Sequence, residues 1–506
     1  MEKKKPNFQV YHQRKERVRQ MLSQGKYDDV SLAGWGHLDD LIAMVMGLGI
    51  YKVLEKINTG IKGACYIPRW VIYNALFLKV LLGEDSYLSL QEGLFKDPGV
   101  LQLMGCTARV MREGFDSSRN KGGHKPFHVD SIRYFQEDIL EGELAKAWPQ
   151  TVSPIVHALK GKKGVFILDA TKQLLYGDYE GIAEQTVVKE TIRKDGKVMQ
   201  TRVHEKGFKI VTLCLLRKGE LIVVAYTKIP IRQHELTVAA ELVKEGQRIL
   251  GENAPSVILV DRGFISGPLF FSWKKQGLDV VVPLKRNMNL LEDMQGLAGL
   301  EKGLEVRLVE DKGKETVIKA FSNLTSLDSY PGMLSGLLVT QYRGQNRAPS
   351  QQWGFLTTLD IRTRKQALTI YRNYDDRSLI ENKGYRELKQ GFKLAHYPGL
   401  SSHAQSLHLF FMLLTFNLVA LWRSGGGERY IGIGIRRLRR QVLTSPDQVI
   451  VYVGRSYDVM SLAEFVAYLG RPPSGKLDDV VKILSPSRSK TLRTERYAFS
   501  LDRDRQ

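Results

Sequence analysis

Two short apolar runs, each followed directly by an aspartate, most constrain how this chain can fold. Val165–Leu168 leads into Asp169, and Val257–Val260 leads into Asp261. Apolar runs of this length that are rich in β-branched residues are typical of buried strands. We expect each strand to end at its aspartate, at the rim of a sheet, where a carboxylate stays charged only beside a cation. Two such acids, with a third later in the chain, predict a site for divalent metal.

Length and charge narrow the class of protein. The chain has 506 residues and a formal net charge of +21, enough for about two to four domains. A basic excess of this size favours a polyanionic partner, with nucleic acid ahead of a membrane surface. A merely soluble basic protein remains an alternative at this point. The three cysteines are widely separated and form no CxxC pair, which argues against a zinc finger and fits a reducing compartment.

The sequence also carries expectations about location. Met1–Pro6 is followed by polar residues rather than by the apolar segment of a signal peptide. The most apolar stretch, Leu407–Trp422, contains His408 and Asn417 and is short for a bilayer span, so we expect a buried helix. We therefore expect a cytoplasmic, nucleoid-associated protein.

Apolar spacing divides the chain into regions of different character. Residues 1–155 are predicted to be a mostly helical, DNA-binding domain that begins with a basic cluster, Arg14–Arg19. Its last helix is expected from about Val129 to Leu159 and could break at Pro149 and Pro154. Residues 156–289 then mix strands and helices, as in an α/β layer. They include a predicted hairpin, in which Phe208–Leu216 and Leu221–Tyr226 flank a glycine-containing turn.

The rest of the chain is predicted to contain a β-rich region, a helical region and a basic C-terminal region. Residues 290–360 hold four short β-like runs separated by turn residues, which predicts a β-rich insertion. Residues 361–425 return to helix, expected at about Gln366–Lys389 and His403–Trp422, until Gly425–Gly427 interrupts the pattern. Residues 426–506 form a basic C-terminal region whose arginine cluster, Arg436–Arg440, is either a DNA contact or a solvated face.

The helix expected around Tyr371 carries a distinctive set of side chains. Arg377 and Glu381 are four positions apart and share a face, which Tyr374 joins. A phenol, a guanidinium and a carboxylate on one face suit DNA phosphates beside a metal. Taken alone, an ordinary surface ion pair explains these residues better.

Three segments together are more specific than any one. Ile167–Thr171, Leu259–Phe264 and the Tyr374…Arg377…Ile380-Glu381 pattern resemble the DDE transposases of bacterial insertion sequences, in the group with a Tyr-Arg-Glu-Lys signature. Gln233–Glu235 also resembles the family, and the similarity spans about residues 130–425. The resemblance implies an α/β fold: a ribonuclease H-like catalytic core, interrupted by a β-rich insertion between the second and third acids and preceded by the helical domain.

The resemblance also implies an activity, a Mg²⁺-dependent DNA transposase of the cut-and-paste type. Asp169, Asp261 and Glu381 would be both the catalytic acids and the ligands of two Mg²⁺ ions, for which Mn²⁺ could substitute. Water would cut first, and the freed 3′-hydroxyl would then attack target DNA. The partners would be the element's terminal inverted repeats and the target duplex, bound by a homodimer.

Six side chains are candidates for contacting that DNA. Tyr374, Arg377 and Lys389 would hold phosphate oxygens, with arginine using its bidentate fork. Lys285 and Arg286 either contact DNA or lie in a solvated loop. Trp353, in the insertion, could stack on a flipped base as in some family members, although core packing is the favoured role.

The lysine of the signature is displaced in this chain. It usually lies seven positions after the glutamate, which is Leu388 here, and Lys389 follows it. On a regular helix seven steps return to within about 20° of the same face, whereas eight overshoot by about 80°. We hypothesise that a π-bulge around Gly384-Tyr385 absorbs the extra residue, because such bulges are frequent at functional sites.

Two other functions are compatible with these residues. The chain could be a domesticated nuclease or recombinase with the same core. It could also be a non-catalytic, basic DNA-binding protein whose acids are structural, although the presence of all three acids counts against that.

Overall fold

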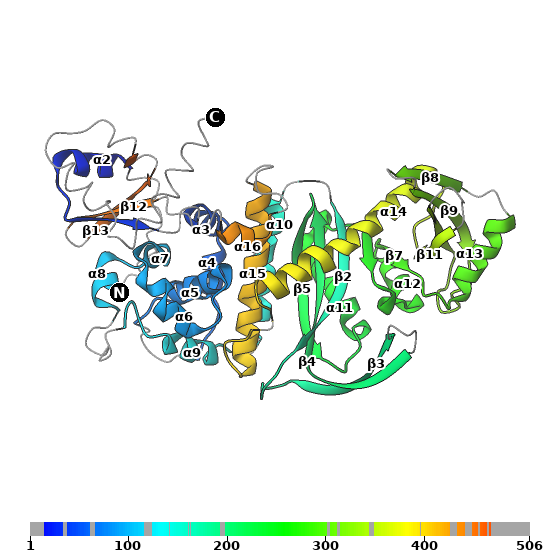
Figure 1. Cartoon of the computed structure of the whole chain (residues 1–506), viewed down its shortest axis with the longest axis horizontal. Helices are drawn as coiled ribbons and strands as arrows, with labels where there is room; N and C mark the ends of the chain where they lie inside the picture. The colour runs from blue at the N-terminus through cyan, green and yellow to red at the C-terminus, as the bar shows by residue number, and fades with distance from the viewer. Residues whose placement is uncertain are drawn as a thin grey trace. The chain divides into compact units, whose positions relative to one another are not determined.

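The computed structural model divides the chain into two compact units. One unit comprises Met1–Glu143 with Gly432–Gln506, and the other comprises Leu144–Ile431 (Figure 1). The described residues are 15–33, 38–60, 66–115, 124–140, 142–159, 161, 163–192, 198–300, 304–310, 314–343, 349–394, 396–425, 433–440, 448–453, 456–462 and 465–466. Arg14, the second and third glycines of Gly425–Gly427 and the tail beyond Pro472 lie outside them.

The first unit is mostly helical but is closed by a small sheet. Its helices are α2 (Lys15–Gln24), α3 (Leu38–Gly47), α4 (Ile50–Leu54), α5 (Arg69–Leu82), α6 (Tyr87–Glu92), η1 (Leu94–Lys96), α7 (Pro98–Leu103), α8 (Ala108–Glu113), α9 (Asp130–Glu137) and α16 (Ile435–Leu438). The sheet has the order β1 (Asp29–Ala33), β12 (Gln448–Val453) and β13 (Ser456–Ser461). The C-terminal region therefore returns to the N-terminal unit, which its sequence did not indicate.

One small core joins the two ends of the chain. Val18 and Met21 of α2 are buried in a cluster with Val449, Val451 and Met460 of the C-terminal strands. Within the predicted basic cluster at 436–440, Arg439 donates hydrogen bonds to the carbonyl groups of Val80, at 2.9 Å, and Leu81. These carbonyls end α5, so this arginine caps a helix C-terminus.

The second unit is built on a mixed sheet. Its core strands are β2 (Val165–Leu174), β4 (Val198–Arg217), β5 (Glu220–Pro230), β6 (Val257–Val260) and β7 (Asp279–Pro283), in the spatial order β5-β4-β2-β6-β7. β4 is antiparallel to β2 and β5, whereas β2, β6 and β7 are parallel. β3 (Ala183–Ile192) pairs with the first half of β4. This arrangement confirms the expected ribonuclease H-like α/β core.

The predicted hairpin between β4 and β5 is confirmed in detail. Lys218 and Gly219 form its two-residue turn with φ of 53° and 73°. Positive φ at both positions is the conformation that matches the twist of the flanking strands.

Helices cover this sheet. They are α10 (Glu143–Ala158), α11 (Leu236–Leu250), η2 (Gly251–Asn253), η3 (Arg262–Phe264), α12 (Gly267–Lys275), α13 (Asn289–Leu300), α14 (Arg364–Leu379) and α15 (Ser402–Gly425), with the π-helical segments η4 (Ile380–Tyr385) and η5 (Glu387–Gly391) after α14. α10 runs through Pro149 and Pro154 without the predicted break. Contacts of Trp148 hold α10 against the sheet and α15. Trp148 is buried, donates a hydrogen bond to the Val224 carbonyl at 2.8 Å and packs on Phe410.

The most apolar stretch is a buried helix, as predicted. Among the described residues, only α15 is long and apolar enough to cross a membrane, yet 94% of its apolar window is buried inside the protein. Asn417 explains one of its polar positions, because its side chain bonds both the N–H and the carbonyl of Val223 at 2.8 Å. β5 pairs with no described strand other than β4, so backbone groups on its other edge need partners from elsewhere, and Asn417 supplies one.

The β-rich insertion is confirmed, but it is not a separate layer. β8 (Leu304–Glu310), β9 (Lys314–Leu324), β10 (Leu334–Arg343) and β11 (Pro349–Thr357) form an antiparallel meander. β11 also pairs with β7, so the core sheet continues into the insertion as one ten-stranded sheet. α14 contacts strands of both parts, from β6 and β7 to β8 and β9 (Figure 1).

Candidate active site

The first two acids lie beside each other at one place in the sheet. β2 pairs in parallel with β6 from Phe166 to Leu168, and Asp169 is the next residue of β2. Asp261 follows the last residue of β6 and accepts a hydrogen bond from the Arg262 amide at 2.7 Å. Neighbouring parallel strands therefore bring residues far apart in sequence to one point.

The prediction that β2 ends at Asp169 was wrong. β2 continues to Leu174 because its other neighbour, β4, keeps pairing with it, from Asp169 opposite Thr212 to Leu174 opposite Gly207. Only the parallel partner ends at the acid. Asp169 is consequently a buried residue in mid-strand rather than a residue at a strand end.

The third acid comes from a helix that changes its winding. α14 begins with a capping box between Thr363 and Gln366 and passes at Ile380 into π-helical turns that extend to Gly391. The hypothesis of a π-bulge between Glu381 and Lys389 is confirmed. Wider turns shift every later residue around the helix axis, which is how an extra residue can be absorbed.

The winding decides which side chain faces the acids. Leu388, at the usual position of the lysine, is buried in the core, whereas Lys389 is exposed. Partial burial lowers the pKa of Lys389, and the nearby charge of Asp169 opposes that shift. Lys389 is therefore close enough to Asp169 to feel its charge, although its role in binding DNA stays a prediction.

Two buried contacts fix the widened helix, and the sequence did not point to either. Tyr385 shares a hydrogen bond of 2.8 Å with Thr212, the residue opposite Asp169 in the sheet. Glu387 accepts two hydrogen bonds from the Arg423 guanidinium, at 2.9 and 3.3 Å. Both contacts lie between Glu381 and the end of η5, so they hold that segment against the core.

The second contact belongs to a larger ion-pair network. Arg423 also contacts Glu220 at 3.3 Å, and Lys383 contacts Glu220 at 3.3 Å and the Gly219 carbonyl at 2.8 Å. The β4–β5 turn, η4, η5 and α15 are joined by these contacts. A charged residue directly after the apolar run Leu407–Trp422 was the one sequence signal that could have indicated a buried partner.

Arg377 lies where the three acids meet. Its Nη2 atom is 3.4 Å from Asp169 Oδ2 and 3.6 Å from Asp261 Oδ1. The same atom is 3.1 Å from Glu381 Oε1, the pair that the i,i+4 spacing predicted. Within the described part of the chain, no group of three or more histidine, cysteine, aspartate or glutamate side chains is arranged to hold a metal ion. The acids converge, but on a guanidinium.

The charges around Asp169 set its acidity. Burial raises the pKa of Asp169 to about 6, Arg377 and the Ala170 amide lower it, and the charges of Asp261 and Glu381 raise it again. Burial also raises the pKa of Tyr374, whose ring packs on Phe355 and lies 5.9 Å from the Arg377 guanidinium. A strongly negative cluster is thus held next to one buried cation.

A cavity of about 1060 Å³ opens from the acids toward the insertion. Asp261, Glu381, Tyr374 and Arg377 line it, together with Arg262, Arg286 and Trp353. Trp353 is half-buried rather than part of the core, and Lys285, next to Arg286, is exposed. The structure therefore brings most of the predicted DNA-contacting residues to one hollow, while their roles remain untested.

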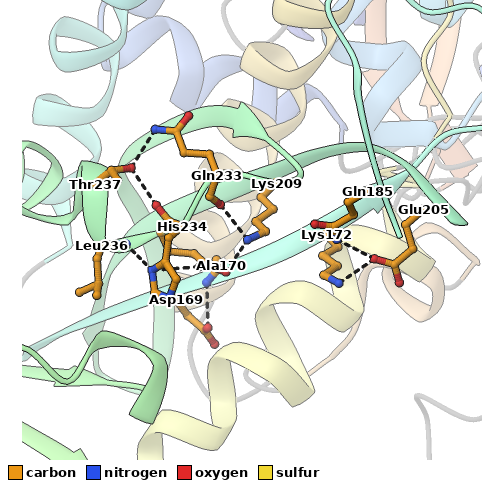
Figure 2. Close-up of polar contacts among 11 residues, drawn as sticks. Asp169, Ala170, Lys172, Gln185, Glu205, Lys209, Gln233, His234, Leu236 and Thr237 are labelled. Carbon is orange, nitrogen blue, oxygen red and sulfur yellow. Dashed lines mark hydrogen bonds and ion pairs between the residues drawn. The ribbon is translucent and has the colours of Figure 1, made fainter. Parts of the chain in front are cut away.

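The Gln233–Glu235 motif lies where β5 leads into α11 (Figure 2). The Gln233 carbonyl accepts a hydrogen bond from Lys209 at 2.8 Å, and Glu235 pairs with the same lysine at 3.2 Å. His234 accepts a hydrogen bond from the Leu236 amide at 3.2 Å.

Figure 2 also shows a second polar cluster, further along β2. There Glu205 accepts hydrogen bonds from Lys172 at 2.7 Å and from Gln185 at 2.9 Å. The Lys209 contacts hold the start of α11 to β4, and the Glu205 contacts hold β4 to β3 and to β2, the strand that carries Asp169.

Comparison with known proteins finds similarity both in sequence and in structure. A family model described as the transposase DDE domain matches residues 160–418. No curated protein matches the chain. Among solved structures, the chain is similar to the piggyBac transposase in a synaptic complex with hairpin DNA, at 12% sequence identity and a TM-score of 0.37, over 93% of this chain and 86% of that chain.

Proposed function

The chain belongs to the family of transposases with a DDE domain, and on that premise we propose that it cuts and joins DNA ends by Mg²⁺-dependent phosphoryl transfer and so mobilises an insertion sequence. The observation that carries this proposal is the convergence of Asp169, Asp261 and Glu381 on one point, around Arg377 Nη2. These acids come from β2, from the end of β6 and from η4, which are far apart in the sequence.

The donor atoms at this point suit the proposed metal. Carboxylate oxygens are the ligands that Mg²⁺ and Mn²⁺ prefer. Asp169, Asp261 and Glu381 together would hold the two ions. Bound ions would supply activation of the attacking oxygen and stabilisation of the leaving oxygen.

The remaining side chains would bind and orient the DNA. Arg377, Tyr374 and Lys389 surround the acids and would hold the oxygens of the phosphate that is cut. Arg286 and Trp353 line the cavity next to them and would contact the same strand, with Lys285 at its exposed edge. A hydrolytic cut would free a 3′-hydroxyl, which would then attack target DNA at the same site.

Charge and family membership support the proposed partners. A net charge of +21 favours DNA and should make binding strongly salt-dependent. Joining two element ends to one target needs two copies of the active site, so we infer a homodimer on DNA. The helical N-terminal unit would bind the element end, in the cytoplasm beside the nucleoid.

A nicking assay on supercoiled DNA tests the proposed chemistry. We expect Asp169→Asn, Asp261→Asn and Glu381→Gln each to abolish nicking in Mg²⁺, while Glu245→Gln, an exposed carboxylate on α11, should leave it unchanged. Cutting by the three variants at the wild-type rate would refute the site. Substrates made from the inverted repeats that flank the gene then separate a transposase from a domesticated nuclease, because only the first should give strand-transfer products.

A further inference from the structure

Arg377 occupies the point around which the proposed metal ligands are gathered. We propose that its guanidinium is the counter-ion of the metal-free site, and that a divalent ion displaces it from the acids into the cavity. The inference rests on the proposed function and adds to it a role for Arg377 before DNA is bound. It gives one side chain two positions, one on the acids and one facing the phosphate.

The contacts of Arg377 are those of a counter-ion. A single nitrogen, Nη2, touches all three carboxylates, and the residue is only 8% exposed. Its Nε is buried without a hydrogen-bond partner among the described residues. The guanidinium is therefore held mainly by the charge of the three carboxylates around Nη2, and not by hydrogen bonds to all of its nitrogens. Another cation can supply the same positive charge to these carboxylates.

The distances leave room for that exchange. Because all three oxygens lie within 3.6 Å of one nitrogen, no two of them are more than about 7 Å apart. A divalent ion binds oxygen at about 2.0–2.1 Å if it is Mg²⁺, so each carboxylate oxygen must move inward by about 1.0–1.6 Å when the ion replaces the nitrogen. The side chains of Glu381 and Asp261 are 57% and 39% exposed and have space for this adjustment, whereas that of Asp169 is only 11% exposed.

The cavity next to the acids offers room for the displaced guanidinium. The ring of Tyr374 lies 5.9 Å from it, within reach of a cation–π contact, and both residues line the cavity. Arg286 lies on the same cavity wall, which makes that side attractive to a phosphate. Leaving the acids would therefore bring Arg377 toward DNA, and metal loading and DNA contact would be coupled.

Metal binding without DNA tests the exchange. We would titrate Mn²⁺ into the full-length chain by calorimetry for wild type, Arg377→Gln, Arg377→Lys and Arg372→Gln, an exposed arginine of the same helix. Arg377→Gln should bind Mn²⁺ about tenfold more tightly or better, because one charged contact is worth about a factor of ten. Arg377→Lys keeps the charge and should stay near wild type, as should Arg372→Gln.

A labelling experiment needs no variant and covers a folding failure of Arg377→Gln. Phenylglyoxal modification, mapped by mass spectrometry, should increase at Arg377 of the wild-type chain when Mn²⁺ is added and stay constant at Arg372. Unchanged labelling, or equal Mn²⁺ affinity of wild type and Arg377→Gln, would overturn the exchange while leaving the proposed metal site intact. Absence of Mn²⁺ binding in every form, together with Mn²⁺-independent nicking, would overturn both.

Discussion

The buried arginine of the ion-pair network offers the sharpest test of what holds the catalytic helix. Arg423 is 1% exposed and donates two hydrogen bonds to Glu387 and one to Glu220. Arg423→Met removes all three while keeping a long apolar stem. Glu220 retains Lys383, so the loss falls mainly on Glu387. Breaking a buried pair by removing one partner costs about 3–5 kcal/mol, and we expect the free energy of unfolding to fall by that amount.

A surface pair that also has two hydrogen bonds between an arginine and a glutamate is the control. Arg248 donates two hydrogen bonds of 2.7 Å to Glu245, but its side chain is 63% exposed. Arg248→Met should therefore cost less than about 1 kcal/mol. Urea unfolding with hydrogen exchange of peptides from residues 380–391 measures the loss where it is expected. In the double variant Arg423→Met/Glu387→Met, both charges are gone and most of the stability should return.

Arg423→Met should also affect the proposed DNA nicking activity. Glu387 lies between Glu381 and Lys389, so Arg423→Met should loosen the segment that carries both and reduce nicking with it. If Arg423→Met is as mild as Arg248→Met, or if the double variant is no more stable than the single one, the network does not hold the helix. Unchanged exchange in residues 380–391 would contradict the same reasoning.

Three other perturbations have defined outcomes. Gly207→Ala should cost about 2 kcal/mol or more in unfolding free energy, because φ is +151° and the new Cβ would lie 1.9 Å from the Gln173 carbonyl, whereas Gly296→Ala, with open space around the new Cβ, should cost less. A chain ending at Ile431 should lose exchange protection in α2 and β1, which pack on the C-terminal strands, but not in β2 or β6. Asp169→Asn should stabilise the metal-free protein at pH 7.5 by up to about 3 kcal/mol and hardly at all at pH 4. The pKa of Asp169 in the folded protein, about 6, exceeds the ordinary aspartate value of 3.8, so the chain binds protons on folding between these pH values and loses stability as pH rises through that range. Denaturation in EDTA across that range tests the sign.

The parts of the fold that depend on local sequence patterns could be predicted from the sequence. The hairpin around Lys218-Gly219, the insertion and the buried helix α15 follow from strand propensity, turn chemistry and apolar runs, and all are present. Pairing between strands that are far apart in the chain leaves no recognisable pattern in either segment. The strand β11 joining β7, and β12 joining β1, were therefore not predicted.

The candidate site also contains some residues that the sequence predicted and others that it did not. The order of acids and their signature spacing indicated Asp169, Asp261 and Glu381, and the displaced lysine indicated the bulge. The strand that continues past Asp169 was missed, because an apolar run ends where burial on both faces ends, not where pairing ends. Glu387 and Arg423 were missed because each is an ordinary charged residue until the fold buries them together.

The widened helix suggests why spacing within a signature can drift without loss of the site. On a regular helix the position of a residue follows from its count along the chain, and one inserted residue would leave Lys389 about 80° away from the face of Glu381. Here the positions are fixed by contacts instead: Tyr385 to Thr212, and Glu387 to Arg423. Both contacts anchor the middle of the widened segment to β4 and α15, and the π-helical turns lie on either side of them. Side-chain anchors within the widened segment, rather than the spacing itself, then determine which residue faces the acids.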